Sequence, residues 1–286
     1  MRTMNTILTT QCDDDVGLIA KITGLCHQHN LNITRNNEFV DKDAKRFFMR
    51  TELSGVISED FLPRLAELLP DGAELALHSS EKTKVVLLAT KEAHCLGGVL
   101  LKQFEKALNI EVLAVIANYA DLAPLAAGFG VPFHVVSHEG LSRAEHDQQV
   151  GDLIASYQPD IIGLAKYMRI LSPEFVARFE GKIINIHHSF LPAFIGAKPY
   201  HQAFERGVKI IGATAHFVNN ELDEGPIILQ DVTHVSHADT ADMMAKMGKD
   251  VEKTVFCKAL QLASEHKLFS LHLYPFLPSY LRYPHD

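Results

Sequence analysis

The rhythm of hydrophobic and polar positions changes near residue 80. Before that point, alternating runs predict strands at 7–12, 33–40, 46–53 and 74–78, and helically spaced apolar residues predict helices at 18–26 and 58–69. Asp14 and Asp15 stand just before the first helix, where we expect them to cap its start and favour its dipole. The order β-α-β-β-α-β predicts a ferredoxin-like sandwich for the N-terminal part of the chain.

Longer elements come after a polar linker at 79–83. Strands are predicted at 84–90, 110–117, 133–136, 161–164 and 182–187, and helices between them at 98–108, 122–129, 145–157 and 173–179. This alternation predicts a mostly parallel sheet that is covered on both faces. The rest of the chain predicts a short helix at 200–206, two strands at 210–218 and 227–233 that we expect to be antiparallel, and a helix at 241–262. We therefore expect an α/β protein, with a small domain at 1–80 and a doubly wound domain at 84–286.

The composition favours a globular protein that acts on a small molecule. Of the 286 residues, 47% are hydrophobic and 22% are charged, enough to bury a full core. The formal net charge of −8 disfavours binding to nucleic acid, because such surfaces depend on Lys and Arg. Apolar runs are too short for a signal peptide or a membrane span, so we expect a cytoplasmic protein with no membrane partner.

Cysteine and histidine give little support for a metal site. The four cysteines lie far apart without a CxxC pair, which indicates reduced structural thiols. Sixteen histidines are many for this length, but there is no HExxH motif. His94-Cys95 and His187-His188 are weak candidates, and we expect no metal.

Two polar side chains end the strand that precedes residue 188. The period of two places Asn185 and His187 on one face, at the edge of the sheet where ligands of open α/β folds bind. An amide and an imidazole there could donate hydrogen bonds to a carbonyl oxygen that becomes negative during nucleophilic attack. Asp223 lies in a Gly-Pro turn. Each residue taken singly is more often structural than functional.

Taken jointly, these residues belong to a longer pattern. The runs 184–192, 216–218 and 221–230 resemble, in order and spacing, the signature of folate-dependent formyltransferases. The resemblance covers about residues 84–267 and implies a Rossmann-like domain that binds 10-formyltetrahydrofolate as substrate and needs no cofactor. It implies that Asn185 holds the formyl oxygen, that His187 aids charge stabilisation and proton transfer, and that Asp223 orients His187 and a water molecule.

The same resemblance implies a folate pocket. The family's Met-Arg-Ile-Leu segment, which lines the pterin pocket largely through backbone contacts, matches four consecutive residues here, and the loop at 219–224 is expected to wall the same pocket. The residues expected to contact folate are Met168, Arg169, Ile170, Leu171, His216, Asn220 and Glu221.

The N-terminal domain resembles the ACT domain, although topology alone does not separate it from other ferredoxin-like sandwiches. The run at 15–20 sits at the ACT family's turn into its first helix, with Val16 where many members have Pro. The resemblance implies a homo-oligomer and a possible amino-acid effector. The residues proposed for that effector site are Val16, Gly17, Leu18, Asn30 and Asn32.

The segment directly after the strand at 84–90 indicates which molecule accepts the formyl group. Glycinamide ribonucleotide formyltransferases have a Gly-rich turn there that grips a phosphate, whereas this chain has Lys-Glu-Ala-His-Cys at 91–95. Glu92 would repel a phosphate, which leaves water as the acceptor. With an ACT-like domain in front, the chain resembles the formyltetrahydrofolate deformylases, whose hydrolysis supplies formate for purine synthesis and balances one-carbon folate pools.

Other interpretations stay open from the sequence. Transfer of the formyl group to glycinamide ribonucleotide or to methionyl-tRNA is the nearest alternative. A non-catalytic amino-acid sensor and a metal-dependent hydrolase are the others. The sequence also does not decide whether His187 or Asp223 accepts the proton from water.

Overall fold

Two compact units make up the chain. The computed structural model describes residues 5–192, 199–271 and 280–282. The first unit holds Met1–Glu81 together with the segment that begins at Glu265, and the second holds Lys82–Ser264. From the sequence we expected one boundary between residues 80 and 84, with the whole rest of the chain in the second domain. In the structure the chain instead returns to the first unit at Glu265.

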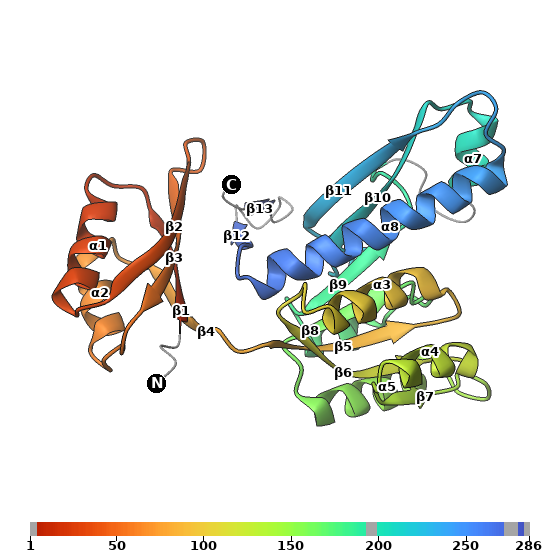
Figure 1. Ribbon diagram of the computed structural model, residues 1–286, viewed down its shortest axis with the longest axis horizontal. Coiled ribbons are helices and arrows are strands. Elements are labelled where there is room, and N and C mark those ends of the chain that lie inside the picture. Colours follow the sequence, from red (N-terminus) through yellow and green to blue (C-terminus); the bar gives the residue numbers. More distant parts are fainter. Residues whose placement is uncertain (1–4, 193–198, 272–279, 283–286) are drawn as a thin grey trace. The chain divides into compact units, whose positions relative to one another are not determined.

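The first unit is an antiparallel sheet with two helices on one face (Figure 1). Its strands pair in the order β2-β3-β1-β4, and every neighbouring pair is antiparallel. Leu18, Ile22, Leu25 and Cys26 of the first helix are buried in the core, as their helical spacing predicts. The predicted ferredoxin-like β-α-β-β-α-β order is confirmed. The elements are β1 (Asn5–Asp13), α1 (Leu18–Gln28), β2 (Asn32–Asp41), β3 (Arg46–Ser54), α2 (Phe61–Leu68) and β4 (Glu74–Ser79).

The start of α1 differs from the expectation. The helix begins after Gly17, whose φ of 85° lies in the left-handed region, and no side chain caps its first turn. Asp15 accepts a hydrogen bond from the backbone N–H of Val16 at 2.8 Å and lies 3.8 Å from the ammonium of Lys21. The prediction that Asp14 and Asp15 cap α1 is therefore wrong, because the glycine turn places both aspartates outside the helix.

The last described part of the chain completes the first unit. Phe269 in β12 (Phe269–Leu271), which pairs with β13 (Tyr280–Arg282), packs on the ring of Phe48 with 5.4 Å between centroids. The ring of His266 stacks on that of His78 at 3.8 Å, and Nε of Arg50 donates to the backbone carbonyl of Glu265 at 2.7 Å. Residues 272–279, between these two strands, lie outside the described residues.

The second unit is a seven-stranded sheet in the order β11-β10-β9-β8-β5-β6-β7 (Figure 1). The five strands from β9 to β7 are parallel, whereas β10 pairs antiparallel with both β9 and β11. This confirms the doubly wound, mostly parallel sheet and the predicted antiparallel pair. The strands are β5 (Thr83–Ala89), β6 (Ile110–Ala117), β7 (Phe133–Val135), β8 (Ile161–Ala165), β9 (Ile183–His187), β10 (Ile210–Phe217) and β11 (Ile227–His234). The helices are α3 (Ala93–Phe104), η1 (Ala120–Leu122), α4 (Ala123–Gly128), α5 (Arg143–Tyr157), α6 (Pro173–Arg178), α7 (Pro199–Glu205) and α8 (Ala241–Ser264).

The helices divide between the two faces of this sheet. On one face, Val150 of α5 and Phe175 of α6 share a core with Ile183 of β9. On the other, α8 packs along β9, β10 and β11 and against α3, and Phe256 of α8 lies over Gly163 of β8. Because parallel strands end at the same edge, the residues directly after β5, β8 and β9 come together there.

Helix α3 begins five residues before its predicted start. The sequence interpretation placed the start at Gly98, but this glycine lies inside the helix, and a Cβ there would come within 2.6 Å of the Lys253 side chain on α8. Gly98 thus serves the close approach of two helices and does not mark a helix boundary. The consequence for function is that His94 and Cys95 lie in the first turn of α3, at the carboxyl edge of the sheet.

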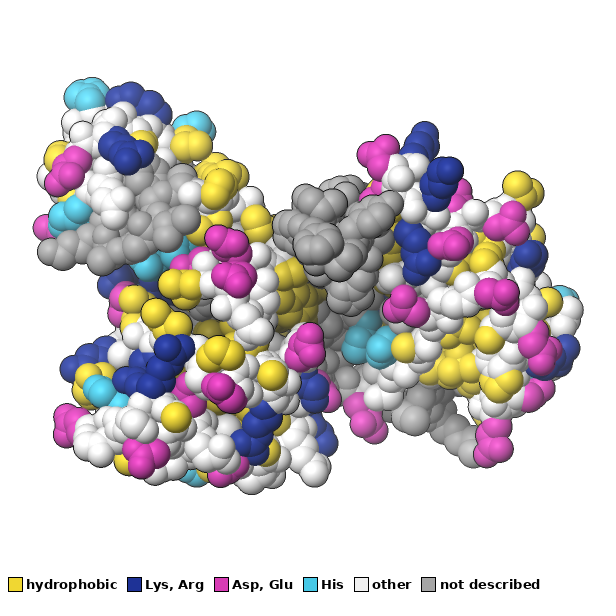
Figure 2. Space-filling view, turned by 180° about the vertical axis from the view of Figure 1, so that it is seen from behind, with side chains coloured by type: hydrophobic (Ala, Val, Ile, Leu, Met, Phe, Trp, Pro, Cys, Tyr) yellow, Lys and Arg dark blue, Asp and Glu magenta, His cyan; other side chains and the backbone are white. Residues whose placement is uncertain are grey.

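The surface carries charges of both signs. On the face seen in Figure 2, basic and acidic side chains are interspersed over each unit and do not gather into one basic patch. Among the described residues, no helix combines the length and the apolar character that a bilayer crossing requires.

The contact of α8 with the sheet predicts a large loss of stability in one variant. Phe256 is fully buried, so Phe256→Ala should lower the free energy of unfolding by about 3–5 kcal/mol, measured by chemical denaturation. Met243→Ala, on an exposed position of the same helix, should change it by about 0.5 kcal/mol or less. Equal effects for the two variants would show that this packing does not stabilise the unit.

Candidate active site

Strand β9 brings the predicted catalytic pair to the edge of the sheet. Asn185 and His187 share the face of β9 that also carries Ile183. On the neighbouring antiparallel strand β10, His216 lies opposite Asn185 and Thr214 lies opposite His187. The register of the two strands therefore gathers three of the predicted site residues.

Asp223 lies beside His187. Its carboxylate oxygen is 3.2 Å from Nδ1 of His187, whose side chain is 6% exposed. Burial by itself raises the pKa of Asp223, but its contacts with His187 and His216 outweigh this and hold the pKa well below its ordinary value. Asp223 is thus an anion that orients His187. Nε2 of His187 is buried and has no hydrogen-bond partner among the described residues.

A contact with His216 on β10 fixes the orientation of the Asn185 amide. Nδ1 of His216 lies 2.9 Å from the backbone carbonyl of Phe217, which can only accept, so Nδ1 carries the proton. In a neutral imidazole, Nε2 of His216 then accepts from the Asn185 amide nitrogen at 3.2 Å. The second N–H of that amide points away from this bond and is available to another acceptor. Nε2 of His216 also lies 3.7 Å from Asp223, which is too far for a hydrogen bond.

The loop between β10 and β11 holds Asp223 in an unusual conformation. Asp223 has a φ of 58°, a left-handed conformation that aspartate tolerates better than most residues. The loop closes where the N–H of Phe217 donates to the carbonyl of Pro226 at 2.9 Å. A Cβ at Gly225 would lie 1.7 Å from the carbonyl oxygen of Phe217, so only glycine fits there.

The residues predicted to contact folate lie in two segments near this edge. Met168 is 59% exposed and Ile170 is 57% exposed, and two exposed apolar side chains after β8 form a surface suited to an aromatic ligand. Leu171 is buried in the core under α5 and α6, and the backbone N–H of Met168 donates to Thr90 Oγ1 at 3.1 Å. Arg169 is partly buried, His216 is buried, and Asn220 and Glu221 are exposed on the β10–β11 loop.

Sequence reasoning missed a second support for the loop after His188. The buried hydroxyl of Thr214 donates to the carbonyl of Ser189 at 2.9 Å and accepts from the N–H of Leu191 at 3.1 Å. The amide of Gln230 donates to the carbonyl of Leu191 and to Thr214, both at 2.9 Å. Gln230 belongs to the family signature, so its place there was the available signal.

A buried ion network was also missed. Glu252 on α8 and Lys166, directly after β8, are buried and lie 3.1 Å apart. A signal existed for both: Lys166 comes after an apolar strand, and Glu252 interrupts the apolar stripe of α8. His94, Cys95 and Glu252 place possible metal ligands within 4.8 Å of one another, but the Lys166 ammonium already neutralises Glu252, and burial raises the pKa of the Cys95 thiol.

The predicted effector residues occupy two places in the first unit. Val16, Gly17 and Leu18 form the turn into α1, whereas Asn30 lies beyond its far end with a φ of 53° and Asn32 begins β2. Eleven helical residues span about 16 Å, so one chain does not bring the two groups together.

Comparison with known proteins agrees with the two-unit architecture. Residues 83–260 match the formyl transferase family and residues 6–69 match the ACT domain. These matches define an ACT domain followed by a formyl transferase domain. The chain is 56% identical to the formyltetrahydrofolate deformylase of Haemophilus influenzae, over 92% of this chain and 95% of that protein. It therefore belongs to the formyltetrahydrofolate deformylase family.

Solved structures extend the likeness. The crystal structure of a formyltetrahydrofolate deformylase from Pseudomonas syringae superposes with a TM-score of 0.91 at 35% identity, covering 99% of this chain and 95% of that one. The glycinamide ribonucleotide transformylase 1 of Symbiobacterium toebii has a TM-score of 0.67 at 28% identity, covering 76% of this chain and 100% of that chain.

The low pKa of Asp223 predicts how its contribution to stability depends on pH. Because the folded state holds this pKa below the unfolded value of about 4, the stabilisation is complete above that value and is lost as the pH falls through the lower one. We expect Asp223→Asn to cost about 1.5–3 kcal/mol at pH 7, with a smaller difference in acid, measured by denaturation across pH. Glu224→Gln, in the same loop, is the control. A difference that grew in acid would contradict the ionised state.

Proposed function

We propose that this protein hydrolyses 10-formyltetrahydrofolate to formate and tetrahydrofolate, with Asn185, His187 and Asp223 as its catalytic residues. Membership of the formyltetrahydrofolate deformylase family supports the substrate. The observation that carries the catalytic assignment is the state of His187, whose Nδ1 faces Asp223 while its buried Nε2 has no partner among the described residues. A buried polar atom of this kind is suited to contact a reacting molecule.

In the proposed reaction, His187 is the general base. With a proton on Nδ1 donated to Asp223, the neutral imidazole has its lone pair on Nε2. Nε2 takes a proton from water as the water oxygen attacks the formyl carbon, and Asp223 stabilises the imidazolium that results. The low pKa of Asp223 makes it a poor proton acceptor, which favours His187 for this role.

Asn185 stabilises the charge that develops on the formyl oxygen. One N–H of its amide is held by His216, which leaves the other directed to an oxyanion. The proton on His187 then passes to N10 as the C–N10 bond breaks, and formic acid and tetrahydrofolate are released. Imidazolium donation to the oxyanion, as the sequence suggested, is not needed in this scheme.

The surroundings of the trio support folate as the ligand. The exposed side chains of Met168 and Ile170 would contact the pterin ring, with Arg169, Leu171, His216, Asn220 and Glu221 around the same pocket.

All four cysteines are free and buried, which favours a reducing compartment, and we propose the cytoplasm. The formate released would supply purine synthesis and balance the one-carbon folate pools.

The purified protein should release formate from 10-formyltetrahydrofolate without any acceptor, measured in a coupled formate dehydrogenase assay. Asn185→Ala should lower kcat on the order of a hundredfold, because one oxyanion donor is lost. Gln148→Ala, on the exposed side of α5, is a matched control that removes an amide outside the proposed site.

Strict dependence on glycinamide ribonucleotide or methionyl-tRNA would replace the hydrolase by a transferase. Folate binding without turnover would support a non-catalytic sensor. Loss of activity after chelation, together with bound metal in elemental analysis, would support the metal hydrolase. Near-normal turnover in Asn185→Ala would contradict the catalytic assignment.

We further propose that an amino acid binds where Val16, Gly17 and Leu18 of one chain meet Asn30 and Asn32 of a second chain in a homo-oligomer. The separation of the two groups within one chain supports a site formed between chains. Titration calorimetry of the full-length protein with each amino acid should detect binding of one of them, and Gly17→Val should abolish that heat, since a branched side chain is strained at a φ of 85°. Absence of heat for every amino acid would contradict the effector.

A further inference from the structure

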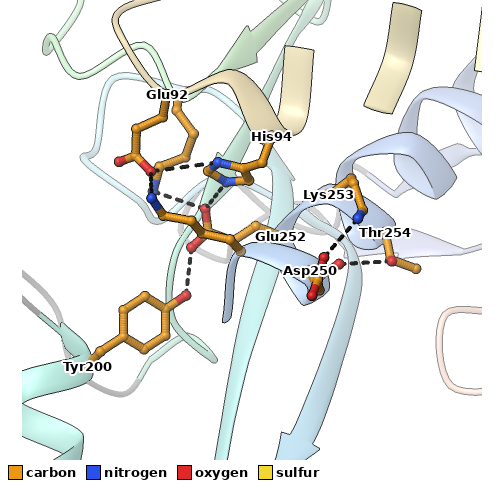
Figure 3. A network of polar contacts seen from close by, with 9 residues as sticks. Glu92, His94, Tyr200, Asp250, Glu252, Lys253 and Thr254 are labelled. Atoms are coloured by element: carbon orange, nitrogen blue, oxygen red, sulfur yellow. Dashed lines mark hydrogen bonds and ion pairs between the residues drawn. The ribbon is translucent and has the colours of Figure 1, made fainter. Parts of the chain in front are cut away.

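Glu252 is the centre of a network of polar contacts that also includes Glu92, His94 and Tyr200 (Figure 3), and the buried Lys166 pairs with the same carboxylate. Oε2 of Glu252 is 2.8 Å from Nε2 of His94 and 3.1 Å from Nζ of Lys166. The hydroxyl of Tyr200 on α7 donates to Oε1 of the same carboxylate at 2.6 Å. Burial alone raises the pKa of Glu252, but hydrogen bonds from His94 and Tyr200 and the charge of Lys166 lower it to about 2, so Glu252 is ionised.

A second acidic group extends the network. Glu92, at the start of α3, lies 3.0 Å from the ammonium of Lys249 and 3.6 Å from Nδ1 of His94. Glu92 and His94 are part of the Lys-Glu-Ala-His-Cys run at 91–95. The side chains that stand in place of a phosphate-gripping turn are therefore engaged with the ionised groups of α8.

His188 connects this network to the catalytic side of the sheet edge. Its ring stacks on that of His187 with 4.9 Å between centroids. The pKa of His188 is lowered to about 4, chiefly by burial and also by the nearby charges of Lys166 and His187, which together outweigh the opposing effect of Glu252 and Asp223. His188 is the first residue after β9, in a bend, and its ring is near enough to Lys166 and Glu252 on one side and to His187 and Asp223 on the other for all four charges to act on it.

The two faces of the sheet divide the approaches to the formyl carbon. Leu171, the last residue of the proposed folate segment, and Tyr167, directly before it, belong to the core under α5 and α6. The network instead joins α3, α7 and α8, on the opposite face. In a transfer reaction the acceptor must reach the carbon from a direction that the folate does not occupy. The network lies with α3, α7 and α8, away from the face that carries the proposed folate segment.

The network is costly for a purely structural feature. Glu252 is 1% exposed and Lys166 is 5% exposed, and burying two charges costs several kcal/mol that an apolar pair of the same size would not. The fold also makes room for it: a Cβ at Gly248 would lie 2.1 Å from the hydroxyl of Tyr200. Glycine at this position of α8 allows Tyr200 to reach Glu252.

From these contacts we propose that His94, Lys166, Tyr200 and Glu252 restrict the formyl acceptor to water by filling the α3–α8 side of the site. The inference rests on the proposed hydrolase activity and deepens it. Three donors that could hold an anionic or amine acceptor, on His94, Lys166 and Tyr200, are turned onto Glu252, and Glu92 adds negative charge at the start of α3. Only a molecule as small as water then reaches the carbon beside His187.

The test is the partition of the formyl group between water and a larger nucleophile. O-methylhydroxylamine is uncharged at neutral pH, and its nitrogen can attack the formyl carbon. The C–N10 bond then breaks, the amine proton passes to N10, and N-formyl-O-methylhydroxylamine forms. Formate and this product are measured together by mass spectrometry, with heat-denatured enzyme as the background. Their ratio does not depend on how much of the enzyme is folded.

The wild-type protein should form formate almost alone. His94→Ala should raise the ratio of formylated amine to formate about tenfold or more, since removing a group from a small pocket changes discrimination by this order. Tyr200→Phe, which keeps the ring and loses only the bond to Glu252, should raise it less. His134→Ala is the matched control, because His134 bonds to Tyr157 from β7, at the other end of the sheet from β9.

An unchanged ratio in both His94→Ala and Tyr200→Phe, with formate still released, would overturn this inference and leave the hydrolase intact. Absence of formate from the wild-type protein would overturn the proposed hydrolysis and the inference with it. A rise of the same size in His134→Ala would assign the effect to general loosening of the fold and would also overturn the role of the network.

Discussion

The register in which β9 pairs with β10 is the constraint on which the site depends. It sets His216 opposite Asn185, so that one imidazole orients the amide, and it sets Thr214 opposite His187, where its hydroxyl holds the next loop of the chain. A shift of one residue would turn each of these side chains to the opposite face. The antiparallel pairing of β10 with β9 in a mostly parallel sheet thus has a chemical consequence, since it brings the side chains of a second strand to those of the first.

Two buried charge clusters meet at the stacked pair His187–His188. Asp223 acts on His187 and also lies near His216, while Lys166 and Glu252 act on His188. In water such groups would interact weakly, but in a buried site their charges are poorly screened. The protein thus holds the catalytic histidine and closes the neighbouring approach with separate sets of residues.

Elements with a clear period were predictable from sequence, and so was the place of Asn185 and His187 at the end of a strand. The period of two and the rule that ligands bind at carboxyl edges were enough for this. The start of α1 and of α3 was not, because in each case a glycine had a tertiary or conformational role that local capping rules do not describe. The ion network was not predicted for another reason: in the sequence, Glu92 and Glu252 cannot be told from surface charges, because they come together only when α3 and α8 pack against each other. Buried charge pairs are a property of tertiary structure, and a single sequence records only that an acidic residue interrupts an apolar stripe.

The first unit is built from two parts of the chain that are far apart in the sequence, namely the N-terminal residues and the segment after α8. Phe269 covers Phe48, and His266 stacks on His78, although the members of each pair are far apart in the sequence. During synthesis, the N-terminal sheet therefore leaves the ribosome with one aromatic face uncovered, and it is completed only after the whole second unit has been made. Substitutions at Phe269 or His266 would thus be felt at Phe48 or His78, near the opposite end of the sequence. A nascent chain with an exposed Phe48 is also where contact with a chaperone would be of most use.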